Sequence, residues 1–211
     1  PRHLLQSQRL DRPGVGVSLR VETLTGDALT AALPDLARLR IAVFRAYPYL
    51  YEGDPDYERR YIQAYGESPG AVIVGCFDGE TLVGAATAAP MEDHAAEFAA
   101  PFEARGHDVT EILYCGESVL LPAYRGRGVG HAFFDRREAH GRALGRRYAC
   151  FCGVVRAADD PRRPADYAPL DPFWRKRGYE PLEGVTARYA WREIGDAEET
   201  EHKMQFWMRR L

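Results

Sequence analysis

A strand, a glycine-rich turn and a helix follow one another between Glu117 and Asp135. Residues 117–121 read ESVLL, residues 125–130 read RGRGVG, and an amphipathic segment comes next. Such a turn leaves several backbone N–H groups without helical partners at the positive end of a helix, where a phosphate or pyrophosphate binds well. The glycines allow close approach to the backbone, and Arg125 and Arg127 add positive charge. The segment therefore predicts an anion site.

Two common phosphate-binding motifs do not fit this turn. A Walker A loop ends in Gly-Lys-Ser/Thr, whereas Gly130 is followed by His131. A dinucleotide-binding fingerprint needs G-x-G-x-x-G near the start of a βαβ unit, whereas this chain has G-x-G-x-G late in its sequence. Neither motif accounts for this turn.

Composition excludes several classes of protein. The chain has 211 residues and a formal net charge of -3, which disfavours nucleic acid as a partner. No apolar run approaches the ~20 residues that span a bilayer, and residues 1–16 do not resemble a secretory signal. We expect a cytoplasmic protein with no membrane partner.

The four cysteines lie in strand-like apolar segments, at positions 76, 115, 150 and 152. This placement predicts buried, reduced thiols. Cys150 and Cys152 form a C-x-C, not the C-x-x-C of a redox site or a zinc knuckle. No His/Cys cluster has the spacing of metal ligands, so we predict no metal.

The hydrophobic pattern predicts strands mixed with a few helices in one domain over residues 17–211, after a flexible N-terminal segment 1–16. The predicted strands are 17–23, 71–77, 81–89, 112–121, 147–155, 186–194 and 203–210. The predicted helices are 27–47 with a break at Pro34, 55–65, part of 91–108, 128–144 and 171–178. The apolar face predicted for helix 128–144 consists of Val129, Ala132, Phe133, Ala139 and Ala143.

Two motifs carry a resemblance to a known family. Arg125-x-x-Gly128-x-Gly130, after a strand that ends in Leu-Leu-Pro-x-Tyr, resembles the acyl-CoA motif of the GNAT N-acetyltransferases. The segment DPFWRKRGY at 171–179 looks like the end of that family's late helix. The resemblance covers about residues 17–210, and more narrowly the chain looks like bacterial domains found with carbon–nitrogen hydrolases. It implies an α/β (α+β) fold with a mixed, mostly antiparallel sheet of about seven strands and about four helices.

The resemblance implies acetyl-CoA as cofactor, with the pyrophosphate on the turn. It also implies that the backbone of the preceding strand binds the pantetheine arm, while the side chains of Leu120 and Leu121 are as readily explained as core. The predicted cofactor-binding residues are Val119, Leu120, Leu121, Arg125, Gly126, Arg127, Gly128, Val129 and Gly130.

Acetyl transfer needs a neutral amine, a hydrogen-bond donor for the developing oxyanion and a proton for the leaving thiolate. The resemblance implies that a Glu on the strand before the motif acts as base. Glu117 is the first candidate, because a Glu in an apolar strand is costly unless it has a partner, and a structural salt bridge is the alternative. Glu111, at the strand's start, is more typical of a solvated end residue. The N–H of Leu120 is the predicted oxyanion donor.

The general acid departs from the family pattern, since Trp174 stands where the family has a Tyr. An indole does not protonate a thiolate as a phenol does. Tyr167, Tyr114 and Cys152 are the alternatives, or the thiolate leaves without an acid. We predict Tyr167 as the second catalytic residue, against a packed loop aromatic.

The loop at 47–54 is aromatic and acidic, and the resemblance places it over the acceptor. Tyr49, Tyr51 and Glu52 are the predicted substrate-binding residues, with Asp54 as a further charge, although such aromatics also pack on sheets. The segment 91–108 would serve as a lid, a dimer contact or decoration. His94, His107 and His131 are expected at the surface without a role.

These observations predict an acetyl-CoA-dependent N-acetyltransferase that acts on the amine of a small molecule by direct attack. A non-catalytic acyl-CoA-binding or regulatory domain and a protein or peptide N-acetyltransferase remain as alternatives. A homodimer stays open.

Overall fold

One mixed sheet runs through the molecule. The computed structural model describes residues 8–10, 18–94 and 96–211. Within these ranges the sheet has the order β1-β2-β3-β4-β5-β6-β8-β7. Its strands are β1 (Gln8–Leu10), β2 (Leu19–Leu24), β3 (Val72–Asp78), β4 (Thr81–Pro90), β5 (Ile112–Leu120), β6 (Tyr148–Val154), β7 (Glu180–Trp191) and β8 (Thr200–Arg210). All seven predicted strands are present, and β1 adds a short edge strand whose backbone pairs with β2. The rest of the predicted segment 1–16 lies outside the described residues.

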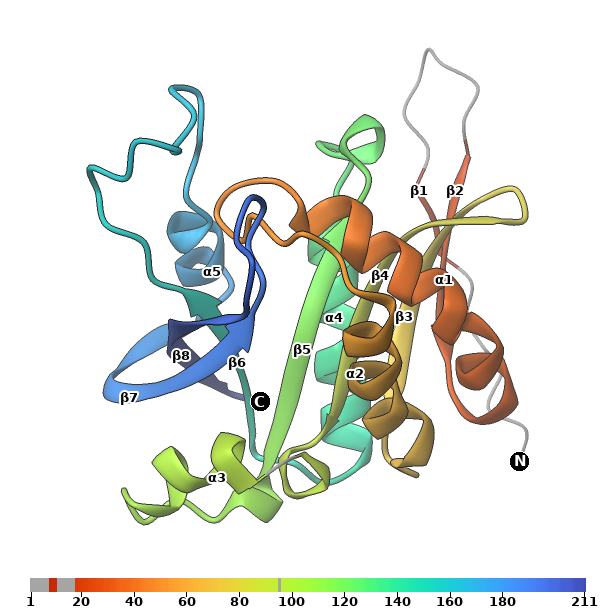
Figure 1. Cartoon of the computed structure of the whole chain (residues 1–211). Helices are drawn as coiled ribbons and strands as arrows, with labels where there is room; N and C mark the ends of the chain where they lie inside the picture. The colour runs from red at the N-terminus through yellow and green to blue at the C-terminus, as the bar shows by residue number, and fades with distance from the viewer. Residues whose placement is uncertain (1–7, 11–17, 95) are drawn as a thin grey trace, which may run out of the picture.

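Helices cover both faces of the sheet (Figure 1). They are α1 (Gly26–Phe44), α2 (Pro55–Glu67), α3 (Ala96–Glu103), α4 (Val129–Ala143) and α5 (Asp171–Lys176). α1 and α2 bury Leu36 and Tyr65 against one face, while α4 buries Val129 and Phe133 against the other. Because both faces are covered, β4 is apolar along almost its whole length instead of alternating. No helix in the described ranges is long and apolar enough to cross a membrane.

The predicted break at Pro34 is wrong, because α1 runs unbroken from Gly26 to Phe44. A proline inside a helix removes one backbone hydrogen bond, and here the burial of Leu29, Leu36 and Leu39 outweighs that loss.

The predicted face of α4 is also partly wrong. Ala139 and Ala143 are exposed, whereas Arg137 and Glu138 are buried. Hydrophobicity does not reveal this, because the partners of the two buried charges lie on other segments of the chain. Arg137 binds groups on β4 and β5, and Glu138 binds residues after α5 and on β8.

The segment 91–108 contributes core instead of a free appendage. Phe98 of α3 packs on Tyr189 of β7 at a ring-centroid distance of 4.6 Å. Phe102 packs edge-on against Phe206 of β8 at 4.8 Å. α3 therefore joins the second half of the sheet to β5 on the face that α1 and α2 cover.

The sheet divides between β5 and β6. They form its one parallel pair within the described ranges, and the pairing runs only from Ile112–Tyr148 to Tyr114–Cys150. Beyond it the two strands diverge, as Figure 1 shows. The edge of β5 that faces β6 is therefore free for another hydrogen-bonding partner at residues 115–120.

Candidate active site

The glycine turn has the backbone that the sequence predicts. Gly126 has a φ of 74° and Gly128 a φ of 81°, both in the left-handed region that favours glycine. A Cβ at either position would meet no atom within 4 Å. Backbone conformation, not crowding, therefore requires these two glycines, and the space above them is open. Gly130 is helical, and a Cβ there would make only an ordinary contact with Phe173.

The turn leads into the positive end of α4. The first helical hydrogen bond joins the N–H of Ala132 to the carbonyl of Gly128 at 3.2 Å. The N–H groups of the first turn therefore have no acceptor within the helix. The Arg125 Nε lies 3.2 Å from the Leu120 carbonyl and an Arg127 Nη lies 3.3 Å from the Ala123 carbonyl, which keeps both charges at the turn. This donor set fits the pyrophosphate of CoA.

The end of β5 presents backbone groups to the divergence. The N–H of Leu121 donates to Val83 of β4 at 3.0 Å. Because successive peptide groups alternate in direction, the N–H and carbonyl of Leu120 point toward β6. The side chains of Val119 and Leu120 pack in the core, so only the backbone at these positions is available to a ligand.

Glu117 lies on β5 and is almost completely buried, with 5% of its surface exposed. Its Oε2 accepts hydrogen bonds from the Tyr61 hydroxyl at 2.5 Å and lies 3.2 Å from an Arg40 Nη. Arg40 also donates from Nε to Glu58 at 2.6 Å. The Glu117 Oε1 is buried and has no hydrogen-bond partner among the described residues. We call Arg40, Glu58, Tyr61 and Glu117 the Glu117 cluster.

Charge determines the protonation states in the Glu117 cluster. Burial by itself would lower the pKa of Arg40, but Glu117, Tyr61 and Glu58 outweigh it and keep that pKa well above its ordinary value. Burial, and then the charge of Glu117, raises the pKa of Tyr61. Tyr61 therefore remains a hydrogen-bond donor to the carboxylate at neutral pH. One cation and two carboxylates leave this buried cluster with a formal charge of -1.

Arg40, Glu58 and Tyr61 were not predicted from the sequence. Two signals were available. Arg40 follows Leu36 by four positions and so falls on the buried face of α1. Tyr57, Tyr61 and Tyr65 recur every fourth residue along α2, which indicates one aromatic face. Neither signal shows that both helices aim these groups at β5.

Part of the loop 47–54 lines the same face of the sheet. Tyr49 packs against Phe44 at 4.5 Å between ring centroids, and burial raises its pKa. The Tyr51 hydroxyl accepts from the N–H of Asp54 at 3.0 Å and is buried beside Glu58. Glu52 lies 3.8 Å from Arg45 and is partly exposed. Of the three predicted acceptor residues, the rings of Tyr49 and Tyr51 lie nearest the Glu117 cluster.

Asp54 does not serve as a further free charge. Its carboxylate caps α2 by accepting from the backbone N–H groups of Asp56 at 2.8 Å and Tyr57 at 3.1 Å.

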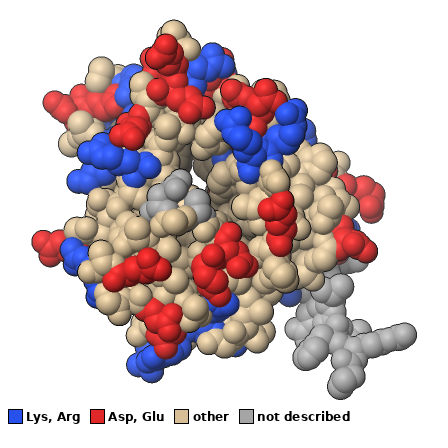
Figure 2. All heavy atoms as spheres, turned by 60° about the horizontal axis from the view of Figure 1, so that its bottom comes forward, with Lys and Arg blue, Asp and Glu red and all other residues tan. Residues whose placement is uncertain are grey.

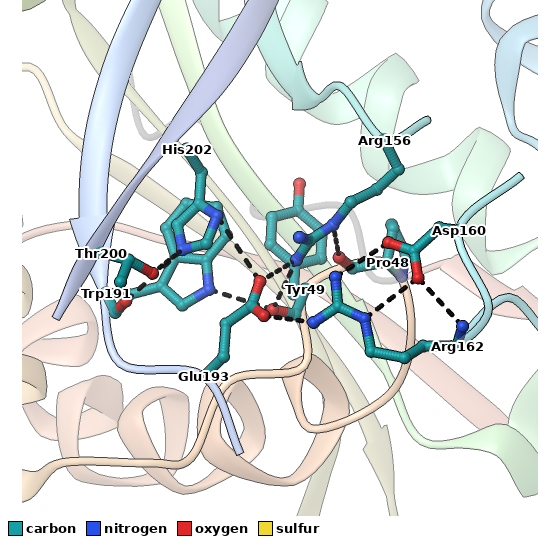
Figure 3. Close-up of polar contacts among 9 residues, drawn as sticks. All are labelled: Pro48, Tyr49, Arg156, Asp160, Arg162, Trp191, Glu193, Thr200 and His202. Atoms are coloured by element: carbon teal, nitrogen blue, oxygen red, sulfur yellow. Dashed lines mark hydrogen bonds and ion pairs between the residues drawn. The ribbon is translucent and has the colours of Figure 1, made fainter. Parts of the chain in front are cut away.

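A second polar cluster holds this loop against the far end of the sheet (Figure 3). It consists of Arg156, Arg162, Trp191, Glu193 and His202, and we call it the Glu193 clamp. Buried Glu193 accepts from Arg156 and from Arg162, the latter at 2.5 Å. Arg156 also donates to the carbonyls of Pro48 at 2.6 Å and Tyr49 at 3.2 Å. The indole N–H of Trp191 donates to the Tyr49 carbonyl at 3.0 Å. The Glu193 clamp thus fixes the backbone on either side of Tyr49.

Figure 2 shows the molecule with the bottom of Figure 1 turned toward the viewer. This face has a hollow near its middle, and acidic side chains lie on more than one side of the hollow.

Tyr167 lies over the same loop. Its ring meets Tyr47 edge-on at 4.8 Å, and the Arg163 guanidinium lies 5.2 Å from its centroid. Burial raises its pKa, so the hydroxyl is protonated at neutral pH. These contacts put Tyr167 at the outer edge of the loop, and its predicted catalytic role stays a prediction.

Trp174 is a packing residue. A Cβ on Gly153 of β6 would lie 3.1 Å from its ring, and Trp174 also meets Trp207 at 5.1 Å. Its contacts lie on the face that α4 covers.

The other two candidate acids, Tyr114 and Cys152, lie together on the face of the sheet that α1 and α2 cover. The Tyr114 hydroxyl lies 3.4 Å from the Cys152 sulfur. Burial raises the pKa of Tyr114 and raises that of Cys152 to about 11, so both hold their protons at neutral pH.

His94 is not the surface residue expected from the sequence. It packs edge-on against Tyr114 at 4.6 Å and also contacts Phe98 and Tyr65. Its Nε2 is buried without a partner among the described residues, and burial lowers its pKa to about 4. The two residues before it, Glu92 and Asp93, are acidic and gave no sign of this packing.

The acetyltransferase (GNAT) family model matches residues 36–164, more than half of the chain. A comparison with curated proteins gives no match.

Among solved structures, the fold is similar to that of yncA from Salmonella typhimurium with its cofactor acetyl-CoA, at a TM-score of 0.54 and 12% identity over 90% of this chain and 94% of that one. It is also similar to a polyamine N-acetyltransferase of Drosophila melanogaster, at 0.57 and 12% identity over 90% and 100% of the two chains. A ribosomal-protein-alanine N-acetyltransferase from Brucella melitensis gives 0.57 and 12% identity over 90% and 99%. Similarity at this level of identity shows the fold alone.

Proposed function

Because this chain belongs to the acetyltransferase (GNAT) family, whose members use acetyl-CoA, we propose that it acetylates the amine of a small cationic molecule, with Glu117 as the base. One observation carries the proposal. The Glu117 Oε1 is buried without a hydrogen-bond partner among the described residues, while Oε2 is held by Tyr61 and Arg40. An unsatisfied buried carboxylate oxygen is costly, and the N–H of an amine would satisfy it.

The residues divide the chemistry as follows. Acetyl-CoA, when bound, supplies the activated acetyl group. Glu117 Oε1 accepts a proton from the acceptor amine, whose nitrogen lone pair then forms the bond to the acyl carbon. The N–H of Leu120 donates a hydrogen bond to the oxygen on which negative charge develops. Tyr114 and Cys152 hold protons on the same side of the sheet for the sulfur that leaves, and Tyr167 is the alternative donor from the loop.

Charge and shape support a small cationic acceptor. The Glu117 cluster has a formal charge of -1, and the aromatic ring of Tyr49 lies close to it, which favours an ammonium group. The ring of Tyr61 is not available for such a contact, because the Arg40 guanidinium covers it at 3.6 Å from the centroid. The Glu193 clamp holds the loop 47–54 against this face of the sheet, and α3 packs beside the loop. These features favour a compact amine over an extended peptide. We also propose that the chain is related to the bacterial domains found with carbon–nitrogen hydrolases.

A screen for thiol release with acetyl-CoA identifies the acceptor. It includes diamines and polyamines, aminoglycosides, amino acids and lysine peptides. We expect diamines or aminoglycosides to react faster than amino acids, because an amino acid brings a carboxylate toward a negative site. Fastest turnover with peptides would contradict the small-molecule part of the proposal and support the protein-modifying alternative.

Glu117→Gln tests the base. We expect kcat with the best amine to fall about 100-fold or more, with the KM for acetyl-CoA changed less than about twofold, because the amide cannot take up the proton. Glu111→Gln is the matched control. Glu111 lies at the start of the same strand, is partly exposed and pairs with Arg147 at 2.8 Å, so its loss should leave turnover unchanged. Equal effects of the two substitutions would rule out Glu117 as the base.

A further inference from the structure

Arg137 of α4 is a buried cation on the face of the sheet opposite the Glu117 cluster. Only 2% of its surface is exposed. One Nη lies 3.1 Å from the Glu117 carbonyl and 3.3 Å from the Thr87 carbonyl, and the other lies 2.9 Å from the Ser118 hydroxyl. Within the described part of the chain no carboxylate lies within ion-pair distance of it. Burying an arginine without a counter-ion costs desolvation free energy, so the position of this side chain calls for an explanation.

The groups that Arg137 binds belong to an irregularity in the β4–β5 ladder. Ala86 pairs with Ser118 and Ala88 pairs with Cys115, so Thr87 alone faces Gly116 and Glu117. This is a β-bulge, in which the extra residue interrupts the ladder and leaves backbone groups without partners. The Thr87 hydroxyl accepts from the N–H of Glu117 at 3.2 Å, and Arg137 donates to the two carbonyls. The side chains of Thr87 and Arg137 thus replace the missing ladder bonds.

The bulge determines the face on which Glu117 lies. Ile112 and Tyr114 point to the side of α1 and α2, and strict alternation would send Gly116 there and Glu117 to the side of α4. The extra residue reverses the alternation, so Glu117 meets Arg40 and Tyr61. Gly116 is required at this point, because a Cβ would lie 2.0 Å from the Tyr65 hydroxyl and 2.6 Å from that of Thr87.

We propose that Arg137 is a positioning residue for the reaction, which holds the bulge so that Glu117 faces the acceptor. The inference rests on the proposed function of Glu117. The positive charge lies directly behind the strand, bonded to the carbonyl of the same residue. Charges of both signs face Glu117 from the other helices, namely Arg40 on α1 and Glu58 on α2, and the hydroxyls of Tyr61 and Tyr65 stand there too.

The test is kinetic, with the acceptor that the thiol-release screen identifies. We expect Arg137→Met to lower kcat about 10- to 100-fold at neutral pH, because small displacements of a catalytic group cost that much. The KM for acetyl-CoA should change less than about twofold. Arg137→Lys keeps the charge and one donor but not the fork that reaches both carbonyls and the Ser118 hydroxyl, so its kcat should lie between those of Arg137→Met and the wild type.

A double-mutant cycle shows whether Arg137 acts through Glu117. The variant with both Glu117→Gln and Arg137→Met should be no slower than Glu117→Gln alone, since the second change has no base left to displace. If the losses in kcat of the two single variants multiply in the double variant, the inference is wrong. An unchanged kcat in Arg137→Met would overturn it as well. If Arg137→Met does not fold, Arg137→Lys and its cycle with Glu117→Gln give the same decision.

Arg146→Met is the control for the loss of a half-buried arginine. Arg146 binds Glu92 and the Thr110 carbonyl near the start of β5, so its loss should lower stability and leave kcat as in the wild type. Failure of the proposed function is a separate result, because the wild type would then release no thiol with any amine, or Glu117→Gln would be fully active.

Discussion

At the scale of single residues, the polar groups in the core are those that a hydrophobic pattern hides. Arg40, Glu58 and Glu117 are each less than a tenth exposed and pair with one another, while Oε1 of each carboxylate has no partner among the described residues. Arg137 donates to backbone carbonyls and has no counter-ion among the described residues. His94 differs from all of these, since its contacts are aromatic rings and burial lowers its pKa. A group of this kind makes stability depend on pH.

His94 should destabilise the fold in mild acid. Its folded pKa is about 4, below the value near 6.5 of the unfolded chain, so the unfolded state binds the proton first as the pH falls. Stability is therefore lost between about pH 6.5 and pH 4, and between pH 7 and pH 5 the loss from this residue is about 2 kcal/mol. His94→Phe should remove that part of the pH dependence. Urea unfolding at pH 7 and pH 5 measures it, and His107→Gln should keep the wild-type difference. An unchanged difference in His94→Phe would show that another group is responsible.

At the scale of elements, the site depends on two departures from regular structure. The bulge in β5 reverses the alternation of a strand. The loop 47–54, which joins α1 to α2, is held by side chains from β7 and from the segment after β6. In both cases an arginine binds two backbone carbonyls. Arg137 donates to Thr87 and Glu117, and Arg156 donates to Pro48 and Tyr49. Irregular backbone is held by side chains where ladder bonds are missing.

The Glu193 clamp should control binding of the amine. Glu193→Gln removes the carboxylate that holds Arg156 and Arg162, so the backbone around Tyr49 loses its anchor. We expect the KM for the amine to rise about tenfold and kcat to change little, because binding contacts are lost without a change at the base. Steady-state kinetics with each substrate varied in turn measures both constants. Glu180→Gln, which breaks an exposed pair with Arg175, is the control. An equal rise in the KM for acetyl-CoA would contradict a role confined to the acceptor side.

At the scale of the whole molecule, the sheet consists of two parts that meet at three parallel residue pairs. The part from β1 to β5 carries α1, α2 and α4, while β6 to β8 continues the sheet beyond the divergence (Figure 1). The free edges between them and the turn at 125–130 lie next to each other. A ligand that fills this gap joins the two parts and should stabilise the fold.

CoA should raise the melting temperature. A ligand at 100 times its Kd stabilises the folded state by about 2.7 kcal/mol, which is roughly 5–10 °C for a chain of this size. Gly128→Ala should abolish most of this shift, because its φ of 81° is unfavourable for alanine and the turn must change. Gly79→Ala is the matched control, with a φ of 58° and the same open space in a distant hairpin. It should lower the melting temperature itself and keep the full shift with CoA. A full shift in Gly128→Ala would place CoA elsewhere.

The sequence alone was sufficient for the features that depend on neighbouring residues. The turn at 125–130, the helix after it and the strand before it follow from glycine conformations and short-range periodicity. The resemblance of two motifs indicated the family, which the family model shows. Four cysteines in apolar strands were predicted to be buried and free, and they are.

Only the tertiary structure determined what surrounds Glu117. Tyr61, Arg40 and Arg137 come from three helices far from it in sequence, and the bulge that turns it toward two of them depends on pairing with β4. The same holds for the Glu193 clamp and for the packing of Trp174 against Gly153. The physical reason is that a turn is encoded by the conformational preferences of its own residues, whereas the partner of a buried charge is encoded only by which distant segments the fold brings together.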